Sequence, residues 1–406
     1  MNPIIETYFR DIGLEEPQSA EALLEKCYSI GNRQAVDKLL KETNARDDGG
    51  AQSNNSFYNK KNADAAVAFA FTGGFDYFYY VGLFDWILHN KDCFGDSILD
   101  VGCDIGIVSC FLGWLFPEKH IVSIDKIEKS IRLAEKLAKK LGITNIEFRR
   151  TDVKKVAETF DTVFSSRTLH ENSMNGIPAV IPDFLECSKT IAEKMTPYAN
   201  AVTALVNEDG TFVTCERQEL DPVFLAWVNV LSGCGFNMLA GFHKRIIVKE
   251  LNKESEFQVG VYSRQAPSRS ADEIFSDYVS AVGALSNIKD FASDWGTASE
   301  WAAELARHLC ADQLMEGYYI VDKAGSKNPV GQFALYTNRY DKDSVLTYQR
   351  FAPENVRVMN NSFSKHKNNN LESIRRTIQQ GKKNGWTIYR INRDENGKES
   401  FGSRVL

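Results

Sequence analysis

Apolar residues in the middle of the chain fall into short runs separated by longer amphipathic stretches. The short runs are 98–101, 121–125, 146–150, 160–166 and 210–216. Residues 107–116 and 127–141 lie between the first three runs, and their apolar positions recur at helical intervals. Short buried strands that alternate with helices indicate a parallel sheet covered on both faces. The pattern therefore predicts an α/β fold.

The pattern continues beyond the fourth run with further helices and strands. Residues 178–198 and 222–231 have helical spacing, and two last strands are expected within 236–250 and 257–264. The charged stretch 251–256 between these strands predicts the loop of a hairpin. The hairpin would complete a sheet of about seven strands.

The first 95 residues predict a helical cap. Residues 1–45 have helical spacing, and 63–71 form a strong helix that Thr72-Gly73-Gly74 is expected to interrupt. The following stretch, 75–88, is unusually aromatic. It is either a helix packed into a core or a lid whose Tyr77, Tyr80 and Trp86 contact a substrate.

The end of the chain predicts a separate α+β module. Residues 266–270 have the composition of a linker. Helices are expected at 271–285, 297–315 and 371–380, and strands at 318–322, 330–336, 345–351 and 387–391, with an Asn-rich loop at 360–370. We therefore expect three parts: a cap at 1–95, a cofactor-binding domain at 96–265 and an accessory module at 271–406.

Composition narrows the class of protein further. The 406 residues are 43% hydrophobic and 25% charged, with no apolar run near the roughly 20 residues of a membrane span. The N-terminus lacks the pattern of a signal peptide, so we expect a cytoplasmic protein without a membrane partner. The eight cysteines and six histidines show no metal-ligand spacing, so we expect no metal.

Charge is unevenly distributed along the chain. The net charge is −6, but residues 345–406 contain 12 Lys/Arg and 5 Asp/Glu, a net charge of +7. Such an asymmetry is compatible with a surface that binds nucleic acid. The other interpretation is a solvated face that balances an acidic neighbour.

A glycine loop follows the first predicted strand, in the sequence Leu99-Asp100-Val101-Gly102-Cys103-Asp104-Ile105-Gly106. It lacks the lysine and hydroxyl of a Walker phosphate loop. It also departs from the dinucleotide fingerprint, because Asp104 takes the place of the middle glycine. A carboxylate beside a pyrophosphate costs Coulomb energy, so a phosphate ligand is disfavoured.

Carboxylates at successive strand ends favour a cationic cofactor. Asp100 and Asp104 would attract the sulfonium and ammonium of S-adenosylmethionine. Asp125, about 20 residues beyond the loop, is placed to accept hydrogen bonds from ribose hydroxyls. Asp152 ends the third strand, where it either meets the adenine or caps a helix.

These motifs together resemble the class I S-adenosylmethionine-dependent methyltransferases over residues 60–265. The matching pieces are the glycine loop, Ile124-Asp125, Thr151-Asp152-Val153, 160–171 and 209–213. The resemblance implies a Rossmann-like, doubly wound, seven-stranded sheet and S-adenosylmethionine as cofactor. It implies cofactor contacts from Asp100, Gly102, Cys103, Asp104, Gly106, Asp125, Lys126, Asp152, Val153 and Ser165.

The loop after the fourth strand is where the family meets its acceptor. This chain lacks the Asp/Asn-Pro-Pro-Tyr/Phe motif of base-amine methyltransferases there, and it contains no Pro-Cys pair of the C5-cytosine enzymes. Its sequence is more similar to the Leu-His loop of small-molecule methyltransferases. His170 could act as general base, with Glu171 orienting it or replacing it and Arg167 binding an acidic group. His170 and Glu171 could equally have a structural role.

The sequence thus favours methyl transfer to an oxygen or nitrogen atom of a small molecule. One alternative is a methyltransferase for RNA or DNA that uses the basic segment 345–406, with Lys365, Lys367, Arg375, Arg376, Lys382 and Lys383 near Trp386 and Tyr389. Another is a non-catalytic scaffold that only binds S-adenosylmethionine. The oligomeric state is left open.

Overall fold

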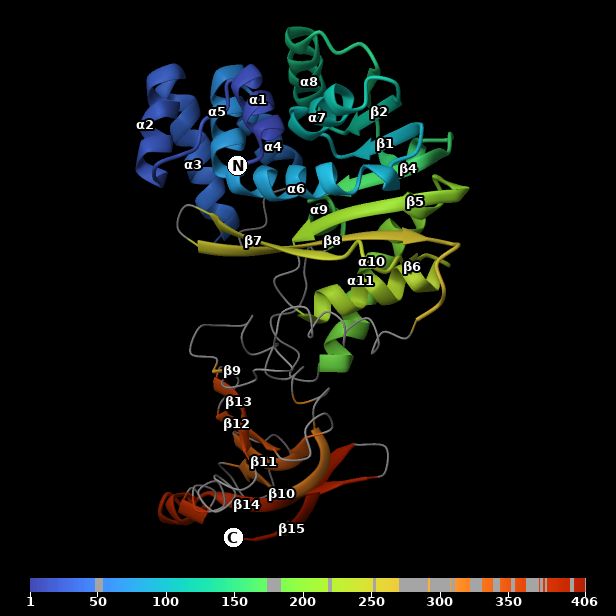
Figure 1. Ribbon diagram of the computed structural model, residues 1–406. Helices are drawn as coiled ribbons and strands as arrows, with labels where there is room; N and C mark the ends of the chain where they lie inside the picture. The colour runs from blue at the N-terminus through green and yellow to red at the C-terminus, as the bar shows by residue number, and fades with distance from the viewer. Residues whose placement is uncertain are drawn as a thin grey trace. The chain divides into compact units, whose positions relative to one another are not determined.

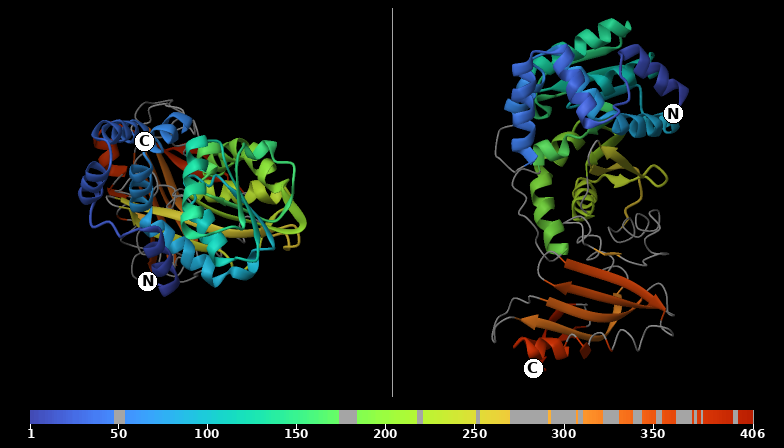
Figure 2. Two further views of the ribbon diagram at one scale, coloured as in Figure 1. Left: turned by 90° about the horizontal axis from the view of Figure 1, so that it is seen from above. Right: turned by 90° about the vertical axis from the view of Figure 1, so that its left-hand side faces the viewer.

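The protein folds into two compact units in the computed structural model (Figures 1 and 2). The first unit comprises residues 1–177, 192–219 and 227–268, and the second comprises 178–191, 220–226 and 269–406. The structure describes residues 1–47, 54–173, 184–217, 221–250, 253–269, 291–292, 307, 311–321, 331–338, 344–351, 355–362, 372, 375–376, 378–394 and 398–405.

A largely parallel sheet forms the centre of the first unit. Its parallel strands are β1 (Ser97–Val101), β2 (His120–Asp125), β3 (Ile146–Arg150), β4 (Phe160–Ser166) and β5 (Val206–Arg217). Antiparallel β8 (Lys253–Ser263) follows β5, giving the order β3-β2-β1-β4-β5-β8-β6. The order reverses between β1 and β4, which is the topological switch point where such sheets bind ligands. The predicted Rossmann-like α/β fold is confirmed.

The edge of this sheet differs in detail from the predicted hairpin. Its last strand position is filled by two pieces, β6 (Asn237–Met238) and β7 (Lys244–Glu250), which both pair with β8. Residues 253–256, expected in a charged loop, belong to β8 and pair with 247–250. Backbone pairing along this ribbon therefore prevails over the polar composition of the stretch.

Helices cover both faces of the sheet. They are α7 (Ile107–Leu115), α8 (Glu128–Leu141), α9 (Leu169–Ser173), α10 (Phe184–Thr203) and α11 (Asp221–Gly233). Helix α8 ends at Gly142, which adopts the left-handed conformation (φ 68°) that favours glycine at this position. Tyr198 of α10 stacks on Trp227 of α11, whose ring meets Phe212 of β5 edge-on.

Six helices precede the sheet: α1 (Pro3–Ile12), α2 (Ala20–Ile30), α3 (Arg33–Asp47), α4 (Asn54–Lys61), α5 (Ala65–Phe75) and α6 (Tyr77–His89). Asn2, Ser19 and Asp64 cap the first turns of α1, α2 and α5 through their side-chain oxygens. Phe84 of α6 stacks on Phe111 of α7 with ring centroids 3.9 Å apart. Helix α6 is thereby part of the core that α7 shares with the sheet.

The glycines 73 and 74 lie inside α5 and do not interrupt it. A Cβ at Gly73 would come within 2.4 Å of Leu14, and one at Gly74 within 2.5 Å of Leu23. The two glycines therefore let neighbouring leucines pack against the helix backbone. That packing compensates for the weak helix propensity of glycine.

The second unit contains an antiparallel sheet in the order β15-β14-β10-β11-β12-β13-β9. Its strands are β9 (Phe291–Ala292), β10 (Ala311–Val321), β11 (Gly331–Asn338), β12 (Ser344–Phe351), β13 (Asn355–Ser362), β14 (Thr387–Arg393) and β15 (Glu399–Arg404). Ile378, in a helical segment, and Trp386 pack against a cluster that contains Ile320, Leu335 and Ile388. A helix-and-strand composition was predicted for this region.

Several details of this unit differ from the sequence prediction. Residues 311–315, expected at the end of a helix, begin β10, and 360–362, expected in a loop, end β13. Strands β9, β13 and β15 were not predicted. Segment 311–315 contains good helix formers, but irregular pairing with β11 places it in the sheet. The expected helix 271–285 lies outside the described residues.

Across the part of the chain that the structure describes, no helix is long and apolar enough to cross a membrane.

Candidate functional site

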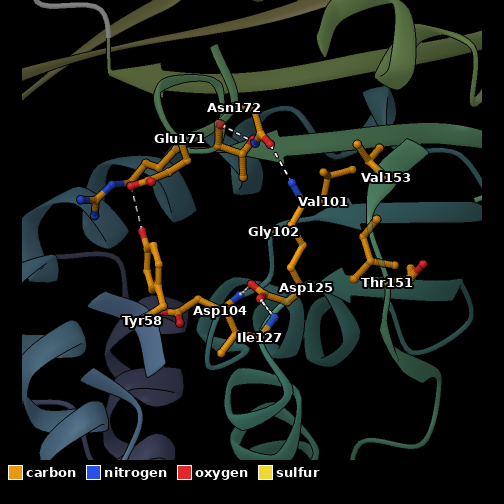
Figure 3. A pocket seen from close by; sticks show the side chains of 14 residues that line it. Tyr58, Val101, Gly102, Asp104, Asp125, Ile127, Thr151, Val153, Glu171 and Asn172 are labelled. Atoms are coloured by element: carbon orange, nitrogen blue, oxygen red, sulfur yellow. Dashed lines mark hydrogen bonds between the residues drawn. The ribbon is translucent and has the colours of Figure 1, made fainter. Parts of the chain in front are cut away.

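A pocket opens at the carboxyl ends of β1 to β4, at the switch point of the sheet (Figure 3). Open α/β sheets bind their ligands at this edge. Its lining residues are Tyr58, Val101, Gly102, Asp104, Ile124, Asp125, Lys126, Ile127, Thr151, Val153, Arg167, Thr168, Glu171 and Asn172. The pocket thus combines the glycine loop, the ends of β2 and β3, the loop after β4 and one residue of α4.

The glycine loop connects β1 to α7 through three residues with positive φ: Gly102 (78°), Asp104 (45°) and Gly106 (83°). A Cβ at Gly102 would come within 2.2 Å of Cγ2 of Thr168, which follows β4. The amides of Gly102 and Cys103 both donate to the carbonyl of Ile124 in β2. The loop is therefore packed closely against the elements on both sides of it.

Asp125 at the end of β2 organises this loop and lines the pocket. Its carboxylate accepts the amide of Asp104 at 3.1 Å and the amide of Ile127 at 2.7 Å. Burial, with a contribution from the nearby Asp104, raises the pKa of Asp125 to about 6. An anionic acceptor held in this way can receive further hydrogen bonds from ligand hydroxyls.

Five of the predicted cofactor residues do not line the pocket: Asp100, Cys103, Gly106, Asp152 and Ser165. Asp100 is 2% exposed and accepts a hydrogen bond from Ser109, and burial raises its pKa to about 7. Cys103 is buried, and Gly106 begins α7 in close contact with Ala134. Asp100, Cys103 and Gly106 support the loop without reaching the pocket. The expectation that Asp100 attracts the cofactor's charge directly is therefore corrected.

The charge of Asp104 is compensated within the protein. Its carboxylate forms an ion pair with Lys61, whose side chain is 5% exposed, and accepts the side-chain amide of Asn62 at 2.9 Å. Burial raises the pKa of Asp104, but Lys61 and Asn62 outweigh it and bring the pKa below its ordinary value. Asp104 lines the pocket and is paired with Lys61, and its expected attraction for the cofactor's positive charge stays a prediction.

The sequence left two roles open for Asp152, an adenine contact and a helix cap, and the structure shows the helix cap. Its carboxylate accepts the amide of Lys154 at 3.0 Å and caps the short helix η2 (Val153–Lys155). It also pairs with Lys126 at 3.1 Å, and Lys126 in turn donates to Asn172. Lys126 and Val153 line the pocket, whereas Asp152 does not.

A buried polar network supports the loop after β4. Ser165 donates to Glu216 at 2.6 Å. The hydroxyls of Ser165, Thr168 and Tyr198 also lie within hydrogen-bonding distance of one another. The second carboxylate oxygen of Glu216 accepts the amide of Leu169 at 3.0 Å. Ser165 is fully buried here, so it supports the pocket wall without lining it. Burial raises the pKa of Glu216 to about 7.

This network predicts a pH-dependent contribution to stability. Because the pKa of Glu216 lies above its ordinary 4.5, the folded state binds this proton more tightly, and the residue lowers stability as the pH rises from about 5 to 8. Glu216→Gln removes the titration. The melting temperature of the variant minus that of the wild type should therefore increase by a few degrees over that pH range. Thermal denaturation measures this difference.

Glu147→Gln is the matched control for this measurement. Glu147 pairs with Arg149 at the protein surface, and that partner lowers the pKa of Glu147. It therefore stays ionised between pH 5 and 8, and the difference between this variant and the wild type should not change with pH. A flat difference for Glu216→Gln as well would contradict the assignment.

Arg167 lines the pocket with a left-handed backbone (φ 58°). Its guanidinium pairs with Asp76, which begins α6, and lies 5.2 Å from the ring centroid of Tyr79. Burial lowers the pKa of Arg167, but Asp76 more than offsets this effect and holds the pKa well above its ordinary value. Arg167 is a permanent cation that an internal carboxylate holds in place.

Glu171 and His170 belong to α9 at the same wall. Glu171 lines the pocket, and its Oε1 accepts a hydrogen bond from the hydroxyl of Tyr58 at 3.1 Å. The backbone of His170 is helical, and its side chain lies outside what the structure describes. The role of His170 as general base remains a prediction.

The aromatic stretch 75–88 is a packed helix, which corrects the expectation that its rings contact substrate. Tyr77, Tyr80 and Trp86 are 4%, 7% and 2% exposed, and none of them lines the pocket. Tyr80 stacks on Phe84, and the indole of Trp86 donates to the carbonyl of Phe242. Aromatic residues have a large apolar surface to bury, and all three side chains are buried in the core.

Several residues that shape the pocket were not identified from the sequence, among them Tyr58, Lys61, Thr168 and Glu216. Glu216 had a detectable signal, since an acid ends the apolar run of the fifth strand in the position that identified Asp125. Tyr58 and Lys61 had none, because α4 is polar and lacks an apolar stripe.

Comparisons with known proteins found similarity to methyltransferases. A family model described as a methyltransferase domain matches residues 94–234. The chain is 26% identical over 126 residues to the ribosomal RNA small subunit methyltransferase G of Parabacteroides distasonis, covering 28% of this chain and 55% of that protein. It is 34% identical over 71 residues to the protein of that name from Bacteroides fragilis, covering 18% and 34%. The chain thus spans about half or less of these relatives' length.

Solved structures with a similar arrangement include two methyltransferase complexes. One is the N-methyltransferase NodS from Bradyrhizobium japonicum with S-adenosyl-L-homocysteine, at 14% identity and a TM-score of 0.36, covering 53% of this chain and 100% of that chain. The other is magnesium protoporphyrin IX methyltransferase from Synechocystis with bound S-adenosylmethionine, at 16% identity and a TM-score of 0.31, covering 45% and 77%.

Proposed function

Because residues 94–234 form a methyltransferase domain with the class I fold, we propose that the protein transfers the methyl group of S-adenosylmethionine to an oxygen or nitrogen atom of an acceptor. The observation that carries this proposal is Asp125. It ends β2 in the pocket, and two backbone amides hold its carboxylate in place. That is the position from which a carboxylate binds ribose hydroxyls in related folds.

The pocket supports a division of roles among its residues. Asp125 would bind the ribose, Thr151 and Val153 at the end of β3 would border the adenine, and the backbone at Gly102 would meet the methionine part. Transfer forms a bond from the acceptor atom to the methyl carbon and breaks the carbon–sulfur bond. Alignment of the reacting atoms supplies most of the catalysis, and His170 would take the acceptor's proton.

RNA is the acceptor class that we propose. The relatives from Parabacteroides and Bacteroides are named as methyltransferases of ribosomal RNA, whereas the earlier preference for a small molecule rested on the Leu-His loop alone. The net charge of +7 over residues 345–406 adds a possible electrostatic contact with phosphates.

The second unit contributes exposed cations to this proposal. Arg375, Arg376, Lys382 and Lys383 are exposed on helical residues that flank Ile378, whereas Lys365 and Lys367 lie outside the described residues. Trp386 is partly buried and packs against the core of this unit. If these cations contact phosphates, the logarithm of the affinity for RNA should fall linearly with the logarithm of the salt concentration.

Methyl transfer from labelled S-adenosylmethionine into a fractionated cell extract tests both proposals. Label in the RNA fraction together with S-adenosylhomocysteine formation is expected. Label among small molecules, lipid or protein would overturn the RNA acceptor and keep methyl transfer. Cofactor binding without S-adenosylhomocysteine formation in any fraction would instead favour a non-catalytic scaffold.

A further inference from the structure

Helix α4 places one aromatic side chain in the pocket wall. Tyr58 is half-buried and lines the pocket, and its hydroxyl donates to Glu171 of α9. Figure 3 shows the side chain standing between Asp104 and Glu171, on the opposite side of the pocket from Val153. Tyr58 therefore joins the glycine loop to the helix after β4 and closes that side of the pocket.

The end of α4 is fixed to the glycine loop. Lys61 donates to Asp104 and to the hydroxyl of Thr72 at 2.8 Å, and its ammonium lies 5.2 Å from the ring centroid of Tyr58. The adjacent Asn62 bridges Asp104 and Ser130 of α8. These buried polar contacts hold the helix that carries Tyr58 in a defined position.

The other side of α4 is also anchored. Phe57 packs into a cluster with Leu23, Val36 and Val67 of the N-terminal helices. Lys60 pairs with Glu42 of α3, which is 7% exposed. Because Phe57 and Lys60 are fixed on either side of Tyr58, the backbone of α4 is held at the pocket wall.

The place of Tyr58 identifies which part of the ligand it meets. The adenine side of the pocket, under the proposed function, is the end of β3 at Thr151 and Val153. Tyr58 lies across from that end, beside Glu171, in the pocket that Arg167 also lines. It borders the methionine part of the cofactor, where the methyl group is transferred.

On the basis of the proposed function, we propose that Tyr58 is a cofactor-contacting residue and that Glu171 is a positioning residue for it. The ring covers the methionine part and keeps water from the transfer site. The hydrogen bond from the Tyr58 hydroxyl to Glu171 holds the ring in that place. This assigns Glu171 a role other than orienting or replacing His170, the two roles that its sequence suggested.

A double-mutant cycle on cofactor affinity tests this assignment. Tyr58→Phe and Glu171→Ala should each raise the dissociation constant for S-adenosylmethionine about fivefold, the effect of one hydrogen bond. The dissociation constant of the double variant should exceed that of the wild type by no more than about tenfold, because both changes remove the same interaction. Tyr58→Ala, which also removes the ring, should weaken binding more than tenfold. Calorimetric titration measures all four variants.

Conservative variants separate positioning from a structural or basic role. Glu171→Gln keeps an oxygen that can accept from Tyr58, so its cofactor affinity should stay within twofold of the wild type. Tyr28→Phe is the matched control, because it removes a tyrosine hydroxyl bonded to Asp37 in the same helical region, away from the pocket. Its affinity should equal that of the wild type.

The possible failures are distinguishable. If the wild type does not bind S-adenosylmethionine, the proposed function fails. If it binds but the Tyr58 and Glu171 variants stay within twofold of it, the inference about Tyr58 fails alone. If the two single effects multiply in the double variant, Glu171 does not position Tyr58. Melting temperatures of the variants identify any loss that comes from unfolding.

Discussion

Asp125→Asn is expected to weaken the binding of S-adenosylmethionine at least 100-fold. The carboxylate accepts two backbone amides, from Asp104 and Ile127, and the proposed ribose contacts add to these. Asparagine keeps only one acceptor oxygen, so one amide would face an NH2 group. Hydrogen bonds to a charged group contribute about 1.5–3 kcal/mol, and 2.7 kcal/mol corresponds to a factor of about 100. Isothermal titration calorimetry measures the change.

Asp152→Asn is the matched control for this variant. It makes the same chemical change at the next strand end, but Asp152 caps η2, pairs with Lys126 and does not line the pocket. Its effect on cofactor affinity should remain below fivefold. The proposed cofactor site would be contradicted if Asp125→Asn bound S-adenosylmethionine with an affinity within threefold of the wild type. A normal melting transition of the variant would show that it is folded.

The sheet was predictable because its signals are local. Buried parallel strands such as β1 and β2 are short, nearly continuous apolar runs, and positive-φ positions such as Gly102 favour glycine. The position of Asp125 at a strand end follows from the same pattern. Each of these features depends on a few neighbouring residues, so the sequence alone contains them.

The partners of the pocket residues were not predictable in this way. Lys61 and Asp104 are 43 residues apart, and Tyr58 and Glu171 are 113 apart. Neither pair follows a helical or strand period. The sequence showed an acid at position 104, but its electrostatic effect depends on Lys61, which only the fold brings to it.

The aromatic stretch shows the limit of periodicity more directly. Apolar and aromatic residues occupy nearly every position of α6, so the pattern does not indicate which side faces the core. Tyr79 illustrates the outcome: its ring is buried, and its hydroxyl lies 2.6 Å from Ser166 at the end of β4. A core helix and a ligand lid require the same residue types, and only the packing distinguishes them.

Gly106→Ala is expected to destabilise the first unit by about 2–5 kcal/mol. A left-handed backbone at φ 83° costs an alanine about 1–2 kcal/mol. The new Cβ would also lie 2.6 Å from Cβ and 2.9 Å from Cα of Ala134 in α8. Overpacking of this kind typically costs 1–3 kcal/mol more, because a backbone atom cannot move aside as a flexible side chain can. Urea denaturation measures the free energy of unfolding.

Gly142→Ala separates the two contributions. Gly142 also has a positive φ, at 68°, but a Cβ there would meet no atom within 4 Å. This variant should lose only about 1–2 kcal/mol, the backbone cost. It should keep its cofactor affinity, whereas Gly106→Ala should lose it, because Ser130 lies one turn before Ala134 on α8 and contacts Asp104. Equal losses of stability in the two variants would show that α7 and α8 can separate without cost, and the close packing of the glycine loop would then not be what fixes the pocket.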